Sequence, residues 1–285
     1  MTKSVKSCLT RLYADDTVIY KASANRLNAI AEIQTDIENY QTWCIQNKLS
    51  VNIAKTKVMV FTAAKYHPNS IDVNLKMDNQ TLQVVTDYKY LGVILDNNLT
   101  FEKHINSVHK VVCFKTYQLS CLRVFLTVKM ALQIFNTTIL PYFDYADIIY
   151  MNAQLGHINK LQIDQNRCLK ICLRLNRLTH TDFVHCEAKT PMLSDRRSAH
   201  LLNYMYIRSR DPDYIDMRQI GTRAHTGPMV NVLRSNCAAF DRSVGYQGAV
   251  CWNLLPPTRR KSETLSIFKY NTKKALKAKI PLVVG

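Results

Sequence analysis

The stretch of sequence that decides the fold is residues 8–20, which read CLTRLYADDTVIY. Two β-prone runs, at residues 8–13 and 17–20, flank a polar break at residues 14–16, and this pattern predicts a β-hairpin. The break holds two adjacent carboxylates, which repel each other on an exposed turn unless a cation neutralises the pair. Mg²⁺ binds one or two carboxylates and completes its octahedron with water and phosphate oxygens. A divalent-metal site is one interpretation, and a solvated turn is the other, because Asp favours turns through local hydrogen bonds.

An amphipathic helix is predicted after the hairpin. Apolar side chains recur there at every third or fourth position, and Ser23 or Asn25 could serve as the N-cap. The apolar positions are Leu27, Ile30, Ile33, Ile37, Tyr40 and Cys44. Beyond this helix, β-prone runs predict strands at residues 49–53, 57–62, 82–85 and 90–95.

From about residue 101 to residue 180, the apolar period becomes that of helices. Pro141 punctuates the first helical segments, whose apolar positions are Ile105, Val108, Val112, Leu119, Leu122, Val128, Leu132, Phe135 and Ile139. A further helical face comprises Leu161, Cys168, Cys172 and Leu175, and it carries the basic side chains Arg167, Lys170, Arg174 and Arg177. After about residue 186 the pattern weakens, and a short basic helix is expected at residues 268–279. The sequence therefore predicts an α+β fold.

The charge of the chain is large and unevenly distributed. The 285 residues carry a formal net charge of +17. Residues 1–150 hold 16 basic and 12 acidic side chains (net +4), whereas residues 151–285 hold 22 and 9 (net +13). A strongly basic segment repels itself unless an anionic partner offsets the charge, and phosphate backbones are the commonest such partner. Binding to nucleic acid is therefore favoured over a basic surface that is merely solvated. It is also favoured over binding to an anionic membrane, because no basic amphipathic helix stands out.

Several protein classes are excluded by composition. The 7 glycines lie well below the usual share of about 7% and argue against Gly-rich fibrous folds. No apolar run reaches the roughly 20 residues of a membrane span. Lys6 and Arg11 interrupt any signal-peptide core, and the 9 cysteines show no disulfide-framework spacing. We therefore expect an intracellular protein with reduced thiols, in the nucleus or the cytoplasm, that is neither secreted nor bound to a membrane.

Three motifs occur in one order along the first hundred residues: Tyr-Ala-Asp-Asp at 13–16, Asn-x-x-Lys-Thr at 52–56 and Tyr-Leu-Gly-Val-Ile-Leu-Asp at 90–96. They resemble motif C, motif D and the primer-grip region of the reverse transcriptases of LINE-type, jockey-like non-LTR retrotransposons. Later segments resemble the thumb and post-thumb landmarks of the same family: Leu140-Pro141 with Tyr145, Leu161-Gln162 with Asn166-Arg167, and Trp252-Asn253-x-Leu255-Pro256. The resemblance implies a partial polymerase palm at residues 1–100, a helical thumb at 101–185 and a basic C-terminal region at 186–285.

The resemblance also implies roles for individual residues of the palm. Asp15 and Asp16 would bind Mg²⁺, with Mn²⁺ as the alternative, beside the primer 3′ end and the incoming deoxynucleoside triphosphate. Tyr13 would pack under the primer terminus. Lys55 or Lys57 would assist the departing pyrophosphate, and the sequence does not choose between these two lysines. For both lysines, a solvated strand edge is the alternative.

Nucleic-acid contacts are implied at two further places. Tyr90, Leu91 and Gly92 would contact the primer, with Gly92 permitting close approach of the backbone; a strand bulge is the alternative for this glycine. Arg167, Lys170, Arg174 and Arg177 would contact phosphates of the RNA template and DNA primer, as would the cluster Arg259-Arg260-Lys261. A solvated helix face or tail is the alternative for these cations.

One departure from the family is large. The family places another metal-binding Asp in motif A, upstream of motif C, but the twelve residues before Tyr13 contain no acid. Tyr145-Ala146-Asp147 mimics motif C superficially, yet it follows Pro141 in a helical pattern and lacks the second Asp. We therefore expect a fragment of an RNA-directed DNA polymerase, acting by two-metal nucleotidyl transfer in the intact parent and inactive alone. The alternative is a non-catalytic nucleic-acid-binding remnant that uses the basic thumb and tail.

Donors of the type that Zn²⁺ accepts occur at Cys168, Cys172, His180 and His185, with the adjacent Cys186. Cys168 and Cys172 lie one helical turn apart on an apolar face, where a free thiol packs as a small hydrophobe. The spacing also differs from common zinc-finger patterns, so packing is favoured over metal binding.

Overall fold

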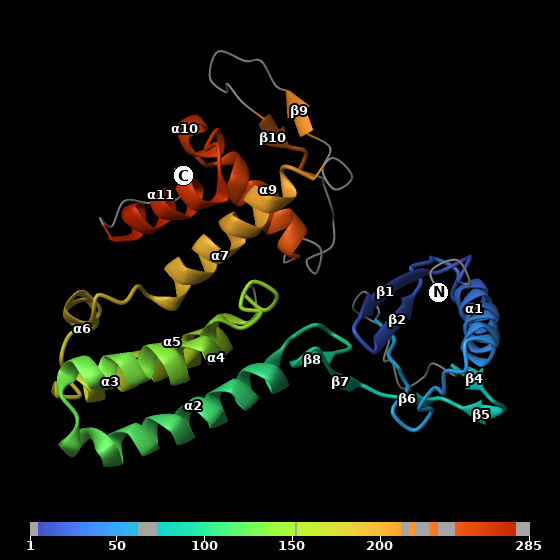
Figure 1. Ribbon diagram of the computed structural model, residues 1–285, viewed down its shortest axis with the longest axis horizontal. Helices are drawn as coiled ribbons and strands as arrows, with labels where there is room; N and C mark the ends of the chain where they lie inside the picture. Colours follow the sequence, from blue (N-terminus) through green and yellow to red (C-terminus); the bar gives the residue numbers. More distant parts are fainter. Residues whose placement is uncertain are drawn as a thin grey trace. The chain divides into compact units, whose positions relative to one another are not determined.

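The computed structural model describes residues 5–61, 73–151, 153–211, 217–219, 228–232 and 243–277. The chain divides into two compact units, residues 1–98 and 99–285 (Figure 1). Both helices and short strands occur, so the mixed composition expected of an α+β fold is confirmed. The boundary predicted near residue 185 falls inside a helix, α6 (Thr181–Ala188), and does not coincide with a division between the compact units.

The first unit begins with the hairpin. Strands β1 (Leu9–Tyr13) and β2 (Asp16–Tyr20) pair antiparallel with Tyr13 opposite Asp16, which confirms the predicted hairpin. Helix α1 (Arg26–Gln46) follows, and the Asn25 side chain caps it by accepting a hydrogen bond from the Asn28 N–H at 3.2 Å. The predicted apolar face is buried or half-buried except at Leu27, which is 76% exposed in the first turn of the helix.

Short strands complete this unit. β3 (Lys57–Val58) pairs in parallel with β6 (Gln83–Val84), and antiparallel pairs join β4 (Lys76–Met77) to β5 (Gln80–Thr81) and β7 (Asp87–Tyr90) to β8 (Val93–Asp96). Apolar residues from α1 and these segments form its core: Ile37, Val73, Leu75, Met77 and Leu82.

Three of the strand predictions need correction. Residues 49–53 form no strand, because a side-chain-stabilised turn at Asn52 folds the chain there. The strand predicted at 57–62 is only Lys57–Val58, and residue 62 lies outside the described residues. The run at 90–95 is not one strand, because residues 91 and 92 form the turn between β7 and β8.

The second unit begins with a helical array. Its elements are α2 (Glu102–Leu122), η2 (Arg123–Phe125), α3 (Val128–Ile134), the π-helical segment η3 (Phe135–Ile139), α4 (Leu140–Asp144), α5 (Leu155–Leu173), α6, and α7 (Leu193–Arg208). Helices α2 and α5 lie side by side (Figure 1). Most predicted apolar positions are fully buried, among them Ile105, Val112, Leu119, Phe135, Ile139, Leu161, Cys168 and Cys172. Leu122 and Val128 are exposed instead, because they lie at the helix ends on either side of η2.

The remaining elements pack against α7 or against one another. They are β9 (Met217–Gln219), β10 (Pro228–Val230), α9 (Val244–Asn253), α10 (Pro257–Arg260) and α11 (Leu265–Lys277). Trp252, Phe268 and Tyr206 form an aromatic centre, with 4.7 Å between the ring centroids of Tyr206 and Phe268. Helix α11 confirms the basic helix predicted at 268–279 as far as Lys277, and residues 278 and 279 lie outside the described residues.

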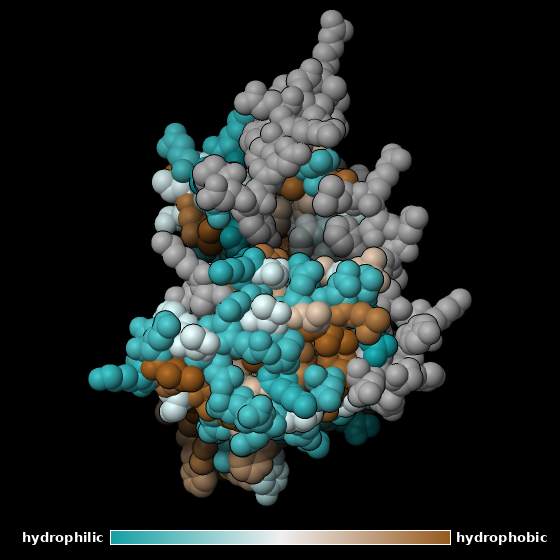
Figure 2. Space-filling view, turned by 90° about the vertical axis from the view of Figure 1, so that its right-hand side faces the viewer, coloured by the Kyte–Doolittle hydropathy of each residue, from teal (hydrophilic) through white to brown (hydrophobic). Residues whose placement is uncertain are grey.

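Among the coloured residues of Figure 2, hydrophilic side chains predominate, and hydrophobic side chains gather between them in a few brown areas. Of the helices in the described part of the chain, none has the length and apolar character that crossing a membrane requires.

Candidate active site

The acidic pair lies at the tip of the β1–β2 hairpin. Ala14 and Asp15 form a two-residue loop, and Ala14 has a φ of 52°. A positive φ at this position suits the twist of a tight hairpin, although a residue with a Cβ atom loses about 1–2 kcal/mol there. Asp15 and Asp16 are both exposed, and no described side chain forms an ion pair with either of them. The turn therefore presents two carboxylates to solvent, and no cation of the described residues neutralises them.

An apolar surface adjoins this acidic tip. Cross-strand partners share one face of a sheet, so Tyr13 lies on the same face as Asp16, and Leu9 lies on the same face as Tyr20. Three apolar members of this face, Leu9, Tyr13 and Tyr20, are exposed, with Tyr13 at 65%, whereas Val18, opposite Arg11 on the same face, is half-buried. A planar ring beside a carboxylate provides a surface on which the sugar or base of a nucleotide can pack.

A buried carboxylate fixes the start of the hairpin to α1. The oxygens of Asp36 accept hydrogen bonds from the backbone N–H groups of Lys6 at 2.8 Å, Ser7 at 2.8 Å and Cys8 at 2.7 Å. Lys21, just after β2, donates to the Ser7 carbonyl at 2.8 Å and forms an ion pair with Glu32 of α1. Both ends of the hairpin are therefore attached to the same helix.

The environment of Asp36 keeps it ionised. Burial raises the pKa of this carboxyl, but the three backbone hydrogen bonds and the Cys8 thiol outweigh burial, and the pKa lies below its usual value. Sequence analysis missed this residue, because its partners are backbone groups about 30 positions earlier and leave no signal in the pattern of side chains.

The Asn-x-x-Lys-Thr segment forms a tight turn. The Asn52 side chain accepts a hydrogen bond from the Lys55 N–H at 3.1 Å, and the Thr56 hydroxyl donates to the Asn52 carbonyl at 2.9 Å. Such a turn explains why Asn and Thr occur at this spacing. The ammonium of Lys57 donates to Gln83 at 2.7 Å across β3 and β6, whereas Lys55 is exposed and has no ion pair among the described residues. Lys55 is therefore the better candidate for binding an anionic ligand.

The predicted primer-contacting residues form a second hairpin turn. Leu91 and Gly92 join β7 to β8 with φ angles of 44° and 82°. Two successive positive φ values are typical of the turn that suits a two-residue hairpin loop, and glycine is favoured at its second position. Gly92 is therefore a turn residue, and the bulge considered from the sequence is wrong. Tyr90 and Leu91 are half-buried, and Gly92 is exposed.

Among the described residues, no third acidic ligand is brought to the first turn. Clusters of three or more His, Cys, Asp or Glu ligand atoms occur twice in the described residues, and neither cluster includes Asp15 or Asp16. Asp147, which mimics motif C, lies 3% exposed in a turn after α4 and not in the expected helix; its carboxylate is 2.7 Å from Nδ1 of His200. The described residues thus offer two hard oxygen donors at the hairpin. This donor set suits Mg²⁺ but does not surround two ions.

The four basic residues predicted along one helix are not arranged as a ladder. Helix α5 ends at Leu173, and Arg174 is its C-cap with a left-handed φ of 56°, so Arg177 lies beyond the helix. The Lys170 ammonium donates to the Arg177 carbonyl at 2.7 Å and fixes this loop. Arg167 and Arg177 are exposed. The prediction of a single helical ladder is wrong, because the helix ends before Arg174.

A buried arginine that sequence analysis missed supports this loop. Arg123 is 7% exposed, and its guanidinium donates to the carbonyls of Ile171 at 3.0 Å and Cys172 at 2.9 Å. These carbonyls belong to the last turn of α5, where a cation is favoured by the helix dipole. The late basic cluster is also less exposed than expected, since Arg260 is 3% exposed, Arg259 is half-buried and only Lys261 of the three is exposed.

The residues considered for zinc are separated by their packing. Cys168 and Cys172 are completely buried, as predicted for small apolar side chains. Both ring nitrogens of His185 have partners, with Nδ1 2.8 Å from the Thr190 carbonyl and Nε2 2.8 Å from the Asn166 side chain. His180 is exposed at the N-cap of α6. These residues form no metal-ligand cluster in the described part of the chain.

Similarity to known proteins extends along most of the chain. The RNA-directed DNA polymerase from mobile element jockey of Drosophila funebris is 28% identical over 191 residues, which are 66% of this chain and 20% of that protein. The protein of the same name from Drosophila melanogaster is 26% identical over 231 residues, 79% of this chain and 25% of the relative. The probable RNA-directed DNA polymerase from transposon X-element of Drosophila melanogaster is 24% identical over 242 residues, 78% and 26% of the two chains.

No family model and no solved structure matches the chain. The chain spans about a fifth to a quarter of the length of the curated relatives that it matches. The resemblance inferred from the motifs is confirmed: over most of its length, this chain is similar to the RNA-directed DNA polymerases of jockey-like and other non-LTR mobile elements.

Proposed function

We propose that the chain is the palm-to-thumb portion of an RNA-directed DNA polymerase, and that Asp15 and Asp16 bind its catalytic divalent cation, Mg²⁺ or Mn²⁺. The observation that carries the proposal is the exposed pair of carboxylates at the tip of a tight hairpin, with no ion pair to any side chain in the part of the chain that the structure describes. When bound, the metal ions stabilise the attacking and leaving oxygens of an in-line displacement. The residues of this chain hold the metal and position the nucleic acid.

Two side chains complete the proposed site. Tyr13, on the face of the hairpin that also carries Asp16, packs beneath the primer terminus. Lys55, held by the turn at Asn52, directs its ammonium toward the leaving pyrophosphate. Hydrogen bonding supports this choice over Lys57, because the Lys57 ammonium already donates to Gln83. The turn at Tyr90, Leu91 and Gly92 contacts the primer, and the small Gly92 lets the backbone approach the strand.

Phosphates of the RNA template and DNA primer are bound by the second unit. Residues 151–285 carry a net charge of +13, and Arg167 and Arg177 are exposed. Arg174 and Lys170 contribute positive charge near the same loop, although their donors also bond backbone carbonyls. Protein partners are not part of the proposal.

A metal-binding and primer-extension experiment tests the catalytic assignment. With the polypeptide alone, we expect Mn²⁺ binding that is weakened by Asp15→Asn and Asp16→Asn, and no primer extension, since two carboxylates cannot surround two ions. Asp78→Asn is the matched control, because Asp78 is exposed in the two-residue turn between β4 and β5. Robust extension that is abolished by Asp15→Ala would refute the expected shortage of ligands. Mn²⁺ binding that is equal in all variants would refute the metal site.

The second candidate function is non-catalytic nucleic-acid binding, and the uneven charge favours it. It predicts binding of an RNA–DNA duplex that weakens steeply with salt and is unaffected by Asp16→Ala. An affinity that is constant from low to high salt would contradict it.

A further inference from the structure

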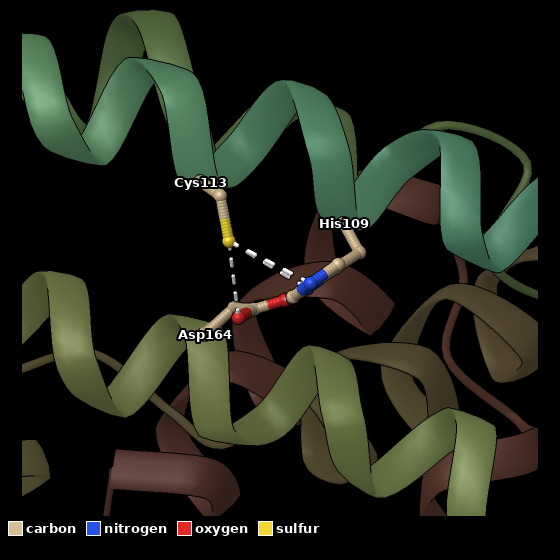
Figure 3. Close-up of side chains that lie close together, drawn as sticks. All are labelled: His109, Cys113 and Asp164. Carbon is tan, nitrogen blue, oxygen red and sulfur yellow. Dashed lines mark hydrogen bonds and ion pairs between the residues drawn. The ribbon is translucent and has the colours of Figure 1, made fainter.

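A cysteine, a histidine and an aspartate converge between helices α2 and α5, far along the chain from the acidic hairpin. His109 and Cys113 lie four residues apart on α2, and Asp164 faces them from α5 (Figure 3). Nδ1 of His109 is 2.6 Å from Oδ2 of Asp164. Sγ of Cys113 is 3.6 Å from Nδ1 of His109 and 3.8 Å from Oδ1 of Asp164. The three side chains thus place nitrogen, sulfur and oxygen donors around one point.

These separations fit a tetrahedral metal. Zinc lies about 2.3 Å from sulfur and about 2.0–2.2 Å from nitrogen and oxygen, so that donors on a tetrahedron are separated by about 3.3–3.6 Å. The two distances from the Cys113 sulfur are already close to this range. The shorter contact between His109 and Asp164 is a hydrogen bond that opens by about 0.7 Å when a metal replaces the shared proton.

The chemistry of the donors favours zinc over magnesium. Thiolate and imidazole are ligands of borderline and soft metals, whereas Mg²⁺ prefers oxygen. One thiolate and one carboxylate balance the charge of Zn²⁺, so the partly buried site carries no uncompensated charge. The Asp164 side chain is 7% exposed and that of His109 28% exposed, which leaves water access to a fourth position.

The other cluster of the second unit is less suitable. Asp144, Asp147 and His200 also converge, but Arg196 already bonds the Asp144 carboxylate, with Nε at 2.9 Å from Oδ1. A metal there would have to displace a bound cation. At the first cluster, no described cation forms an ion pair with Asp164 apart from His109 itself.

We propose that His109, Cys113 and Asp164 form a Zn²⁺ site that joins α2 to α5. On binding, the Cys113 S–H bond breaks, a sulfur–zinc bond forms and that proton passes to solvent. The proton shared by His109 and Asp164 leaves Nδ1, and the neutral imidazole then carries its proton on Nε2. Burial, together with the neighbouring Asp164 carboxylate, raises the pKa of the Cys113 thiol, so the metal is what ionises it. Water completes the coordination. The site stabilises the contact between two helices and is independent of the proposed catalytic metal at the hairpin.

Cobalt titration of the whole chain tests this site. Co²⁺ is added to the reduced, chelator-stripped protein, and thiolate-to-cobalt charge-transfer absorption reports the sulfur ligand. We expect one equivalent to bind, zinc to displace it, and zinc to raise the melting temperature. Cys113→Ser should abolish the absorption. Asp164→Asn should weaken binding by more than the roughly 10- to 100-fold that the loss of a supporting group causes.

Two comparisons separate metal binding from a purely structural link. Cys121→Ser is the matched control, because Cys121 is an exposed cysteine on the same helix, and it should leave the absorption unchanged. Asp164→Asn keeps a hydrogen bond to His109, so a purely structural link between the helices would survive while metal affinity falls. This variant tests the proposal if Cys113→Ser does not fold. Absence of charge-transfer absorption, or absorption that survives Cys113→Ser, would overturn the proposal. So would zinc stabilisation that is equal in the wild type and Asp164→Asn.

Discussion

Replacing Asp36 by Asn removes the charge that holds the start of the hairpin against α1. The Asp36 side chain is completely buried, and its two oxygens accept three backbone hydrogen bonds, from residues 6, 7 and 8. Asn has one carbonyl oxygen, and its NH₂ group would face an N–H donor in place of the second oxygen. At least one backbone N–H therefore loses its partner, and the remaining bonds lose the assistance of the charge.

The size of the effect follows from these bonds. A hydrogen bond to a charged group contributes about 1.5–3 kcal/mol, and bonds within one network are not additive. We therefore expect Asp36→Asn to reduce the local free energy of opening of this segment by about 2–4 kcal/mol. Since about 1.4 kcal/mol is a factor of ten, amide hydrogen exchange at residues 6–8 should accelerate about 30- to 700-fold.

Native-state hydrogen exchange measures this acceleration directly. Glu38→Gln is the control, because Glu38 is an exposed carboxylate on the same helix. Binding of Mn²⁺ should weaken in Asp36→Asn as well, since the turn that presents Asp15 and Asp16 is less well held. If exchange at residues 6–8 were unchanged, or were accelerated equally by Glu38→Gln, the assignment of Asp36 as the anchor of the hairpin would be wrong.

Four further outcomes follow from other contacts. Because the pKa of Asp36 is lowered in the folded protein, its contribution to folding stability should be complete above the ordinary Asp pKa of about 3.9. This contribution should be lost as pH falls through the folded pKa, so the stabilities of wild type and Asp36→Asn in acid titrations should converge at low pH. The hydrogen bond to Asp147 raises the pKa of His200, so the contribution of His200 to folding stability should be complete below about pH 6.5 and be lost as pH rises through its folded pKa. His200→Gln should remove this pH dependence from the melting temperature. Arg123→Met should lower the free energy of unfolding, measured by urea denaturation, by about 2–4 kcal/mol, because two carbonyls of α5 lose a charged donor. Arg167 is exposed, so Arg167→Met should lower it by less than about 0.5 kcal/mol. Arg167→Ala and Arg177→Ala should each reduce the slope of log K against log salt by about one in duplex-binding titrations, and an unchanged slope would show that these cations do not contact phosphate.

Local signals explain which parts of the fold could be predicted from the sequence. The hairpin was predictable because β-prone runs flank an Asp-containing turn, and α1 because its apolar period extends over several turns. The alternation at residues 49–53 was misleading, since a single hydrogen bond from the Asn52 side chain turns the chain there. The basic ladder failed for a similar reason: one residue, Arg174, adopts a left-handed conformation and ends the helix.

Long-range contacts explain what could not be predicted about the candidate sites. The exposure of Asp15 and Asp16 followed from their place in a turn, and the structure agrees with it. The choice of Lys55 over Lys57 needed the parallel pairing that brings Gln83 to Lys57. His109 and Cys113 have a spacing that is visible in a helix, but Asp164 reaches them from 51 positions beyond Cys113. Only tertiary structure joins these three residues.

The way the hairpin is held has a consequence for the proposed active site. Within the described residues, β1 and β2 pair only with each other, and a two-stranded hairpin is marginally stable by itself. Its stability therefore depends on the attachments to α1, made by Asp36 before β1 and by Lys21 after β2. Neither attachment requires a further strand beside the hairpin. The two carboxylates are consequently presented in a defined turn whether or not a third acidic ligand is near. Metal binding and catalysis should therefore separate: the polypeptide should bind a divalent cation weakly through Asp15 and Asp16, while nucleotidyl transfer requires an additional carboxylate.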